Sequence, residues 1–246
     1  DMIGNIEGVD GVIDNVTYRI FSEPTPVTET ERERRARRFT GGEVDGPSRQ
    51  LARYIARVSE QYMPHMKPML VYRLDRYGRG GHHRPFNDLG FPGVRITEAH
   101  ENYTRQHQDL RTEKVLVKAA SGKEKEIEIA YGDVIEGVDF DYAARLTAVN
   151  AIALASLAWA PPPPANARLQ GAVQPAATLS WERVDSPSLA GYKVYWRLTT
   201  EPQWTHSRWV GNTDKFTFEN FIIDNYFFGV AAVGHDGNES VVVFPR

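Results

Sequence analysis

The sequence predicts two domains, an α/β domain with a mostly parallel sheet over residues 1–160 and an all-β antiparallel sandwich over residues 166–246. Strand-like and helix-like patterns alternate in the first part, which favours an α/β arrangement. The second part carries short, evenly spaced strand patterns with turns and no helical period, as small sandwiches do. Between them lie Pro161 to Pro164. Four prolines cannot continue a helix, so residues 161–165 are expected to form a short, stiff linker.

Apolar spacing places the individual elements. In the first domain, strands are expected over residues 12–21, 69–74 and 93–97, and helices over residues 47–62 and 138–159. Val115 and Val117, followed by Ile127 and Ile129, alternate around a Ser121-Gly122 turn, which predicts a solvent-exposed β-hairpin. In the second domain, strands are expected over residues 179–184, 192–198, 215–221, 225–233 and 240–244.

Composition excludes several classes of function. The chain has 246 residues, 41% of them hydrophobic, and a formal net charge of -3. That charge gives no reason to expect a nucleic acid as partner. There is no cysteine, so disulfide frameworks, thiolate metal sites and cysteine nucleophiles are excluded. Since no apolar run reaches about 18 uninterrupted residues, no membrane span is expected.

The second domain resembles a fibronectin type III module. The residues that carry the likeness are Trp181, the run Tyr192-Lys193-Val194-Tyr195, and Tyr226 followed by Phe228. This resemblance implies that Tyr226 is the corner tyrosine, whose hydroxyl ties back to the backbone of earlier residues. It also makes the module a spacer or an adhesive appendage.

The first domain resembles the C-terminal half of co-catalytic di-zinc aminopeptidases of the Vibrio and Streptomyces type, a family that includes glutaminyl cyclases. Three segments carry this likeness: Asp1-Met2-Ile3-Gly4-Asn5, Gly81-His82-His83-Arg84-Pro85-Phe86 with Gly90-Phe91-Pro92-Gly93, and Tyr103 with His107-Gln108-Asp109. The resemblance implies one half of an α/β/α sandwich with a mostly parallel sheet. It also implies a secreted or cell-surface protein, and a bacterial source is expected.

The resemblance also implies a metal site. The family holds two zinc ions, which activate a water molecule and polarise the scissile carbonyl. Here Asp1 corresponds to a ligand of one zinc and His107 to a ligand of the other. Tyr103 corresponds to a hydrogen-bond donor near the developing oxyanion, with packing as its other interpretation, while His83 has a structural or pocket-lining role. The general base and the remaining ligands precede Asp1 in the family, so no catalytic residue is assigned in this chain.

Two features of the chain depart from the family pattern and limit the expected function. His82 stands where the family has aspartate, and one terminal ligand per zinc is too few for tight binding. We therefore expect this chain to be part of a secreted zinc metallopeptidase that acts near peptide N-termini. The chain alone is expected to be inactive. Carboxypeptidase and cyclase activities stay open. Its partners would be a peptide substrate, the N-terminal half of the same protein if cleaved, and further copies if it self-assembles. The alternative is a non-catalytic assembly or surface-adhesion component.

Overall fold

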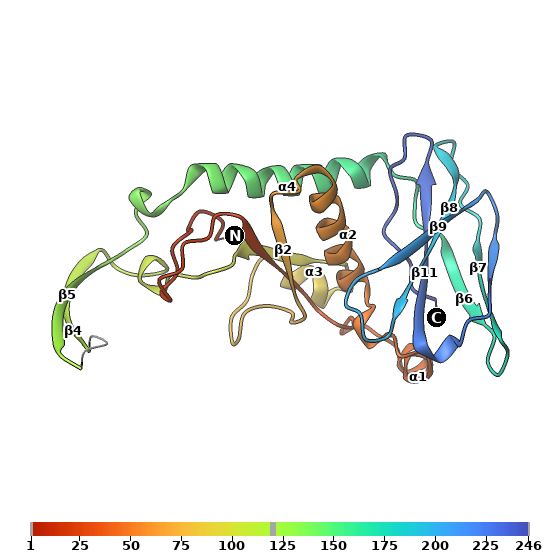
Figure 1. The fold of residues 1–246 in the computed structure, drawn as a ribbon, viewed down its shortest axis with the longest axis horizontal. Coiled ribbons are helices and arrows are strands. Elements are labelled where there is room, and N and C mark those ends of the chain that lie inside the picture. Colours follow the sequence, from red (N-terminus) through yellow and green to blue (C-terminus); the bar gives the residue numbers. More distant parts are fainter. Residues whose placement is uncertain (1, 119–121, 246) are drawn as a thin grey trace.

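The structure is a computed structural model that describes residues 2–118 and 122–245. The first domain contains, in chain order, β1 (Thr17–Ser22), α1 (Glu31–Thr40), η1 (Gly42–Val44), α2 (Pro47–Tyr62), β2 (Lys67–Val71), α3 (Arg84–Asp88), β3 (Val94–Glu98), η2 (Tyr103–Arg105), β4 (Arg111–Lys118), β5 (Glu124–Tyr131), η3 (Ile135–Gly137) and α4 (Phe140–Trp159). The second domain contains β6 (Ala165–Gln170), β7 (Ala176–Glu182), β8 (Leu189–Leu198), β9 (His206–Gly211), β10 (Lys215–Glu219), η4 (Ile223–Asn225) and β11 (Tyr226–Gly234). The molecule is elongated, with the β4–β5 hairpin projecting at one end and the second domain at the other (Figure 1).

The first domain is built on a three-stranded sheet of order β2-β1-β3. β1 pairs with β2 in parallel and with β3 antiparallel, so the sheet is mixed and the expected mostly parallel sheet is wrong for these strands. A parallel return normally needs a crossover helix. α1 and α2 supply one between β1 and β2, whereas the segment before β3 holds only the five-residue α3.

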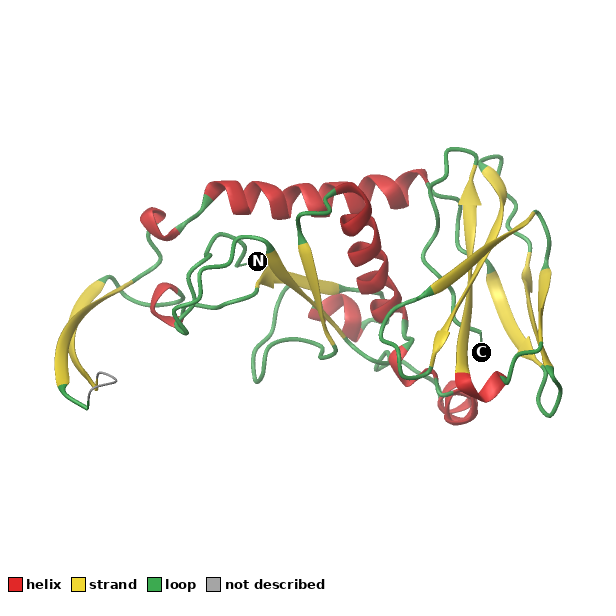
Figure 2. Ribbon diagram, in the orientation of Figure 1, coloured by secondary structure: helices red, strands yellow, loops and turns green. Residues whose placement is uncertain are grey.

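The hydrophobic core of the first domain lies between one face of this sheet and the helices α2 and α4. Strand residues alternate between faces, and Tyr18, Ile20 and Ile96 pack in one cluster with side chains from both helices. The hydroxyl of Tyr142, in the first turn of α4, donates a hydrogen bond to the carbonyl of Thr17 at 2.6 Å. Figure 2 shows α4 as the long helix along the upper edge of the first domain. The opposite face of the sheet therefore carries the alternate residues of β1 and β3.

Both long helices lie where the sequence predicts them, because their ends carry ordinary stop and start signals. Pro47 occupies the first turn of α2 after the non-helical Gly46, a position that tolerates a missing N–H. α4 begins at an N-cap, Asp139, whose carboxylate accepts the Tyr142 N–H at 2.7 Å. It ends at Trp159, before the proline run. No helix among the residues described, 2–118 and 122–245, has the length and apolar character needed to cross a bilayer.

The predicted hairpin is confirmed as the two-stranded sheet β4–β5. Its strands pair antiparallel from Arg111 opposite Tyr131 to Lys118 opposite Glu124. Val115 lies opposite Ile127, and alternate residues on each strand are half-buried. The Ser121 half of the predicted turn lies outside the described residues. The hairpin is a separate arm, as Figure 1 shows.

The second domain is a sandwich of two three-stranded antiparallel sheets, β10-β7-β6 and β11-β8-β9. Its core includes Trp181, Tyr192, Phe218 and Phe228. Four of the expected strands correspond to β7, β8, β10 and β11. The fifth, over residues 240–244, makes only isolated bridges, such as Val230 with Val243. The sequence did not indicate β6 and β9, because both are largely exposed and lack clear alternation.

A tyrosine ties two segments of the sandwich together, but it is not the expected one. Tyr192 is fully buried, and its hydroxyl accepts the backbone N–H of Val184 at 2.6 Å. Tyr226, expected to make such a bond, packs its ring against Phe221 and Phe228. Tyr192 has this role because β8 brings its hydroxyl to the β7–β8 connection.

The two domains share a buried polar interface. Asp45, just before α2, accepts hydrogen bonds at 2.8 Å from Arg197 of β8 and from Arg53 of α2. Arg53 also donates to the Pro202 carbonyl at 2.7 Å, and Trp204 donates to the Gln50 side chain at 3.0 Å. The linker therefore joins two domains that are packed together through charged groups.

Candidate functional site

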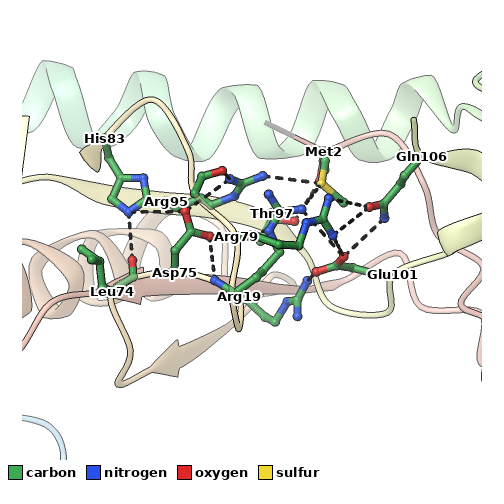
Figure 3. A network of polar contacts seen from close by, with 12 residues as sticks. Met2, Arg19, Leu74, Asp75, Arg79, His83, Arg95, Thr97, Glu101 and Gln106 are labelled. Atoms are coloured by element: carbon green, nitrogen blue, oxygen red, sulfur yellow. Dashed lines mark hydrogen bonds and ion pairs between the residues drawn. The ribbon is translucent and has the colours of Figure 1, made fainter. Parts of the chain in front are cut away.

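A network of buried charges covers the face of the sheet opposite the core. Strand alternation places Arg19 of β1 on that face, and its register partner on β3 is Thr97. Arg95, two residues before Thr97, lies on the same face. The loop between β2 and α3 and the segment after β3 bring further charged side chains to it (Figure 3). The site is therefore assembled from segments that are distant in sequence.

Asp75 is the centre of one part of the network. Its carboxylate lies 3.5 Å from Nη1 of Arg95 and 3.5 Å from Nε of Arg76. Nε2 of His83 lies 3.9 Å from the same carboxylate and 2.8 Å from the carbonyl oxygen of Leu74. Because a carbonyl oxygen can only accept, Nε2 of His83 carries the proton. These contacts fix the loop that joins β2 to α3.

Glu101 is the centre of the other part. It accepts hydrogen bonds from Arg19 at 2.5 Å and Arg79 at 3.1 Å, and Arg76 lies 3.8 Å away. The Gln106 amide donates to it at 3.4 Å. Burial raises the pKa of Glu101, but the hydrogen bond from Arg19 and the charges of Arg19 and Arg76 outweigh burial and hold that pKa below its ordinary value. Glu101 is therefore ionised at neutral pH.

Glu98, three residues earlier, is in the opposite state. It is 2% exposed and its register partner is Tyr18, so it lies on the core face of the sheet. Burial, followed by the negative charge of Glu101, raises its pKa to about 8. Among the residues that the structure describes, Oε2 of Glu98 has no hydrogen-bond partner. Two carboxyls on one short segment thus differ in charge because only one has arginine partners.

We expect Glu101→Gln to lower the free energy of unfolding by about 2 kcal/mol, because Arg19, Arg76 and Arg79 would lose the carboxylate that they share. Urea unfolding at pH 7 measures this. Glu113→Gln is the matched control, since Glu113 pairs at 2.5 Å with Arg111 on the exposed hairpin, where such pairs contribute under about 1 kcal/mol. Equal losses in both variants would contradict a structural role for the Glu101 cluster.

The network also brings together the neighbours of the two predicted zinc ligands. The carbonyl oxygen of Met2 accepts from the Glu98 N–H at 2.9 Å and from the Thr97 hydroxyl at 3.1 Å. Gln106 reaches Glu101 from the other side, and Figure 3 shows both residues at the same cluster. Asp1 itself lies outside the described residues. The contacts of Met2 and Gln106 thus bring the segments next to Asp1 and His107 to one place.

The remaining predicted site residues are found as follows. His107 is exposed and has a positive φ of 50°, a backbone conformation uncommon outside glycine. Tyr103 begins η2 and is 57% exposed. His83 is buried, with its Nε2 proton used by Leu74. The ligand role of His107 and the substrate roles of Tyr103 and His83 stay predictions.

The described residues do not fit a zinc ion by themselves. Within 2–118 and 122–245, no three His, Asp or Glu side chains are grouped closely enough to hold a metal ion. The network contributes four arginines, Arg19, Arg76, Arg79 and Arg95, and this positive charge opposes a cation inside it. The role that the network can have is therefore structural: it holds backbone segments in position. A metal would need ligands beyond those described.

Sequence reasoning missed Asp75, Glu98 and Glu101, together with their arginine partners. Glu98 and Glu101 lie between two of the segments that carry the family resemblance, and they correspond to none of the metal ligands that the resemblance implies. One signal was present. The β3 sequence Val94-Arg95-Ile96-Thr97-Glu98 places charged residues on both faces of a strand, and a buried charge requires a partner.

No protein-family model matches the chain. A protein of Leptosphaeria maculans is 39% identical over all of this chain, a protein of Pyrenophora tritici-repentis 36%, and a protein of Pyricularia oryzae 39%. Each bears the name "Probable zinc metalloprotease". The chain is a homologue of these proteins. It spans about half of their length, 54%, 54% and 47% respectively. The relatives are fungal and do not support the expected bacterial source.

Two fibronectin type III domains are among the solved structures that are similar to part of the chain. The domain from human collagen alpha-1(XX) is 18% identical, with a TM-score of 0.28, and covers 35% of this chain and 81% of that domain. The domain from human contactin 1 is 18% identical, with a TM-score of 0.27, and covers 34% and 76%. These scores leave the fibronectin type III assignment of the sandwich a prediction.

Proposed function

We propose that this chain is part of a zinc metallopeptidase of the aminopeptidase type. The observation that carries the proposal is homology along the whole chain to proteins named probable zinc metalloprotease. The three sequence segments that resemble di-zinc aminopeptidases support the finer assignment. In this proposal Asp1 and His107 are zinc ligands, and the other ligands and the general base come from polypeptide outside this chain.

The buried network would hold the two ligand segments in register. The Met2 carbonyl is bound to β3 through Thr97. Glu101 and Gln106 both accept hydrogen bonds from Arg79, and Arg105 donates to the Asn5 side chain at 2.8 Å. Rigid placement of this kind is what a metal site requires, since small displacements of ligands weaken binding strongly. Tyr103, which is exposed within this segment, would meet the peptide substrate.

We expect this chain alone to release no chromophore from aminoacyl substrates in the presence of zinc. The same chain joined to the remaining segment of the Leptosphaeria maculans relative should do so, and His107→Ala in that chimera should lower both bound zinc and kcat/KM by at least about tenfold. His65→Ala is the control, since His65 is an exposed histidine with no assigned role. Zinc content by atomic spectroscopy and chromophore release are the two readouts.

The competing functions correspond to other outcomes of this assay. Release of residues only from N-terminally blocked peptides with a free C-terminus, or cyclisation of N-terminal glutamine, would replace aminopeptidase with another activity of the same family. A folded chimera that binds no zinc would favour the non-catalytic assembly or adhesion component. We further propose that the protein is secreted, which the relatives do not test.

A further inference from the structure

The sequence contains three Asn-x-Ser/Thr triplets, the acceptor sequence for N-glycosylation. They begin at Asn15, Asn102 and Asn238. In the folded chain these asparagines have very different surroundings. We propose that Asn15 carries an N-linked oligosaccharide and that Asn102 and Asn238 do not. This inference goes beyond the proposed peptidase activity and needs only passage through the secretory route.

Asn15 is an exposed residue in the turn that leads into β1. The turn is held by its neighbour, because the Asp14 carboxylate accepts the N–H groups of Val16 at 2.9 Å and Thr17 at 2.8 Å. None of the side-chain hydrogen bonds among the described residues involves the Asn15 amide. A glycan at this position therefore breaks no contact of the fold.

The surface around Asn15 supports the same assignment. In the loop just before it, Val9, Val12 and Ile13 are large apolar residues with exposed fractions of 56%, 41% and 71%. Exposed apolar residues that gather on one short loop favour association with other molecules. A bulky, hydrophilic oligosaccharide on Asn15 would cover them and keep this loop in solvent.

Asn102 is a poor acceptor in the folded chain. It is 9% exposed, its Nδ2 donates to the Glu7 carbonyl at 3.2 Å, and its Oδ1 accepts from the Thr104 hydroxyl at 2.7 Å. Attaching a sugar to Nδ2 would place a large polar group among these buried contacts. A chain glycosylated at Asn102 is therefore not expected to reach the native fold.

Asn238 is also engaged. Its Nδ2 donates to Asp236 at 2.8 Å, and it lines a cavity of about 340 Å³ between the domains together with Arg57, Lys193 and Glu239. The two residues that follow it, Glu239 and Ser240, are buried. The third residue of this triplet thus contributes its hydroxyl to the fold, since Ser240 accepts from the Ala232 N–H at 3.0 Å.

The modification is a group transfer. The Asn15 Nδ2 attacks the anomeric carbon of a lipid-linked oligosaccharide diphosphate, the co-reactant of this step. A C–N bond forms, the bond between the anomeric carbon and the diphosphate oxygen breaks, and Nδ2 loses one proton. The lipid diphosphate leaves as an anion, and no oxidation or reduction occurs.

The experiment expresses the chain with a cleavable secretion signal in yeast and examines the secreted protein by peptide-N-glycosidase F digestion and peptide mapping. We expect one enzyme-sensitive glycan, located on the peptide that contains Asn15. It should be absent in Asn15→Gln and in Thr17→Val, present in Thr17→Ser, which keeps the acceptor triplet, and unchanged in Asn102→Gln and Asn238→Gln. Catalysis plays no part in this readout, so failure of the peptidase assay leaves it intact.

Three results would overturn the proposal: a secreted wild-type chain without glycan, a glycan that survives Thr17→Val, or a glycan mapped to Asn102 or Asn238 of folded protein. If Asn15→Gln is not secreted, the comparison of Thr17→Val with Thr17→Ser decides, because both variants keep Asn15 and only Thr17→Ser keeps the hydroxyl of the acceptor triplet. Circular dichroism on each secreted variant establishes that folded protein is compared.

Discussion

Asp45→Asn should lower the free energy of unfolding by about 3–5 kcal/mol, because it removes the counterion of two buried arginines. The Asp45 side chain is 0% exposed and the Arg197 side chain 1%. Arg53 donates to the same carboxylate at 2.8 Å. With the negative charge gone, both guanidinium groups would remain in a region where burial already lowers the pKa of Arg197. Thermal and urea unfolding at pH 7 measure the loss.

Arg197→Met is the matched comparison for this interface. It leaves the Asp45–Arg53 pair in place, and the methionine stem can occupy part of the space beside Phe227, whose ring centre lies 4.5 Å from the Arg197 guanidinium. We expect it to be less destabilising than Asp45→Asn, because the Asp45 carboxylate keeps Arg53 as its partner. The contact of Arg197 between the domains is lost in this variant. Glu31→Gln, in an exposed pair with Arg34 and Arg35, should change stability by under about 0.5 kcal/mol. Similar losses in all three variants would contradict a specific role of the buried pair.

The same interface changes how the second domain is understood. The proline run predicts a short, stiff linker, and the resemblance of the second domain implies a spacer or an appendage, which needs few contacts with the first domain. Instead, the loop around Pro202 binds Arg53 at 2.7 Å and Tyr72 at 2.6 Å. Tyr72 directly follows β2 and begins the loop that carries Asp75, Arg79 and His83. The sandwich therefore supports one end of the loop on which half of the charged network is built.

The elements that the sequence predicts well are those with a regular spacing of apolar residues. α2, α4 and the β4–β5 hairpin have regular apolar spacing, and all three lie close to their predicted bounds. Strand direction has no such signature, so the antiparallel placement of β3 was missed. The network was hidden for a related reason. Arg19 and Glu101 are 82 residues apart, and only the pairing of β1 with β3 brings them together.

The predicted site residues show the same limit. The resemblance selects each of four residues separately: Asp1, Tyr103, His83 and His107. A sequence motif does not show which other residues contact and position these side chains. For His83 the structure supplies an answer in the Leu74 carbonyl and Asp75. For His107 it supplies the neighbour, Gln106, and its contact with Glu101. The residues that position a site are thus the ones that sequence reasoning finds last.

Glu98→Gln should make the protein more stable than wild type at high pH and close to wild type at low pH. The pKa of Glu98 is raised from 4.5 to about 8 in the folded state. Between these values the folded protein retains a proton that the unfolded chain has lost, so wild-type stability falls as pH rises through this window. A shift of this size corresponds to at most about 5 kcal/mol. Glutamine, which resembles the neutral carboxyl and does not titrate, removes the loss.

The measurement is the free energy of unfolding of wild type and Glu98→Gln at intervals from pH 4 to pH 9, with histidine contributions cancelling in the difference. We expect the two curves to separate above about pH 5 and to differ by on the order of 3 kcal/mol near pH 9. Glu101→Gln is the matched control, because the pKa of Glu101 is lowered and the stability it contributes is lost only as pH falls below its ordinary value. Parallel curves for wild type and Glu98→Gln across this range would show that Glu98 is ionised in the folded protein. If Glu98 is neutral, Glu101 is the one negatively charged carboxylate of this pair. The arginines of the network then form their ion pairs with Glu101.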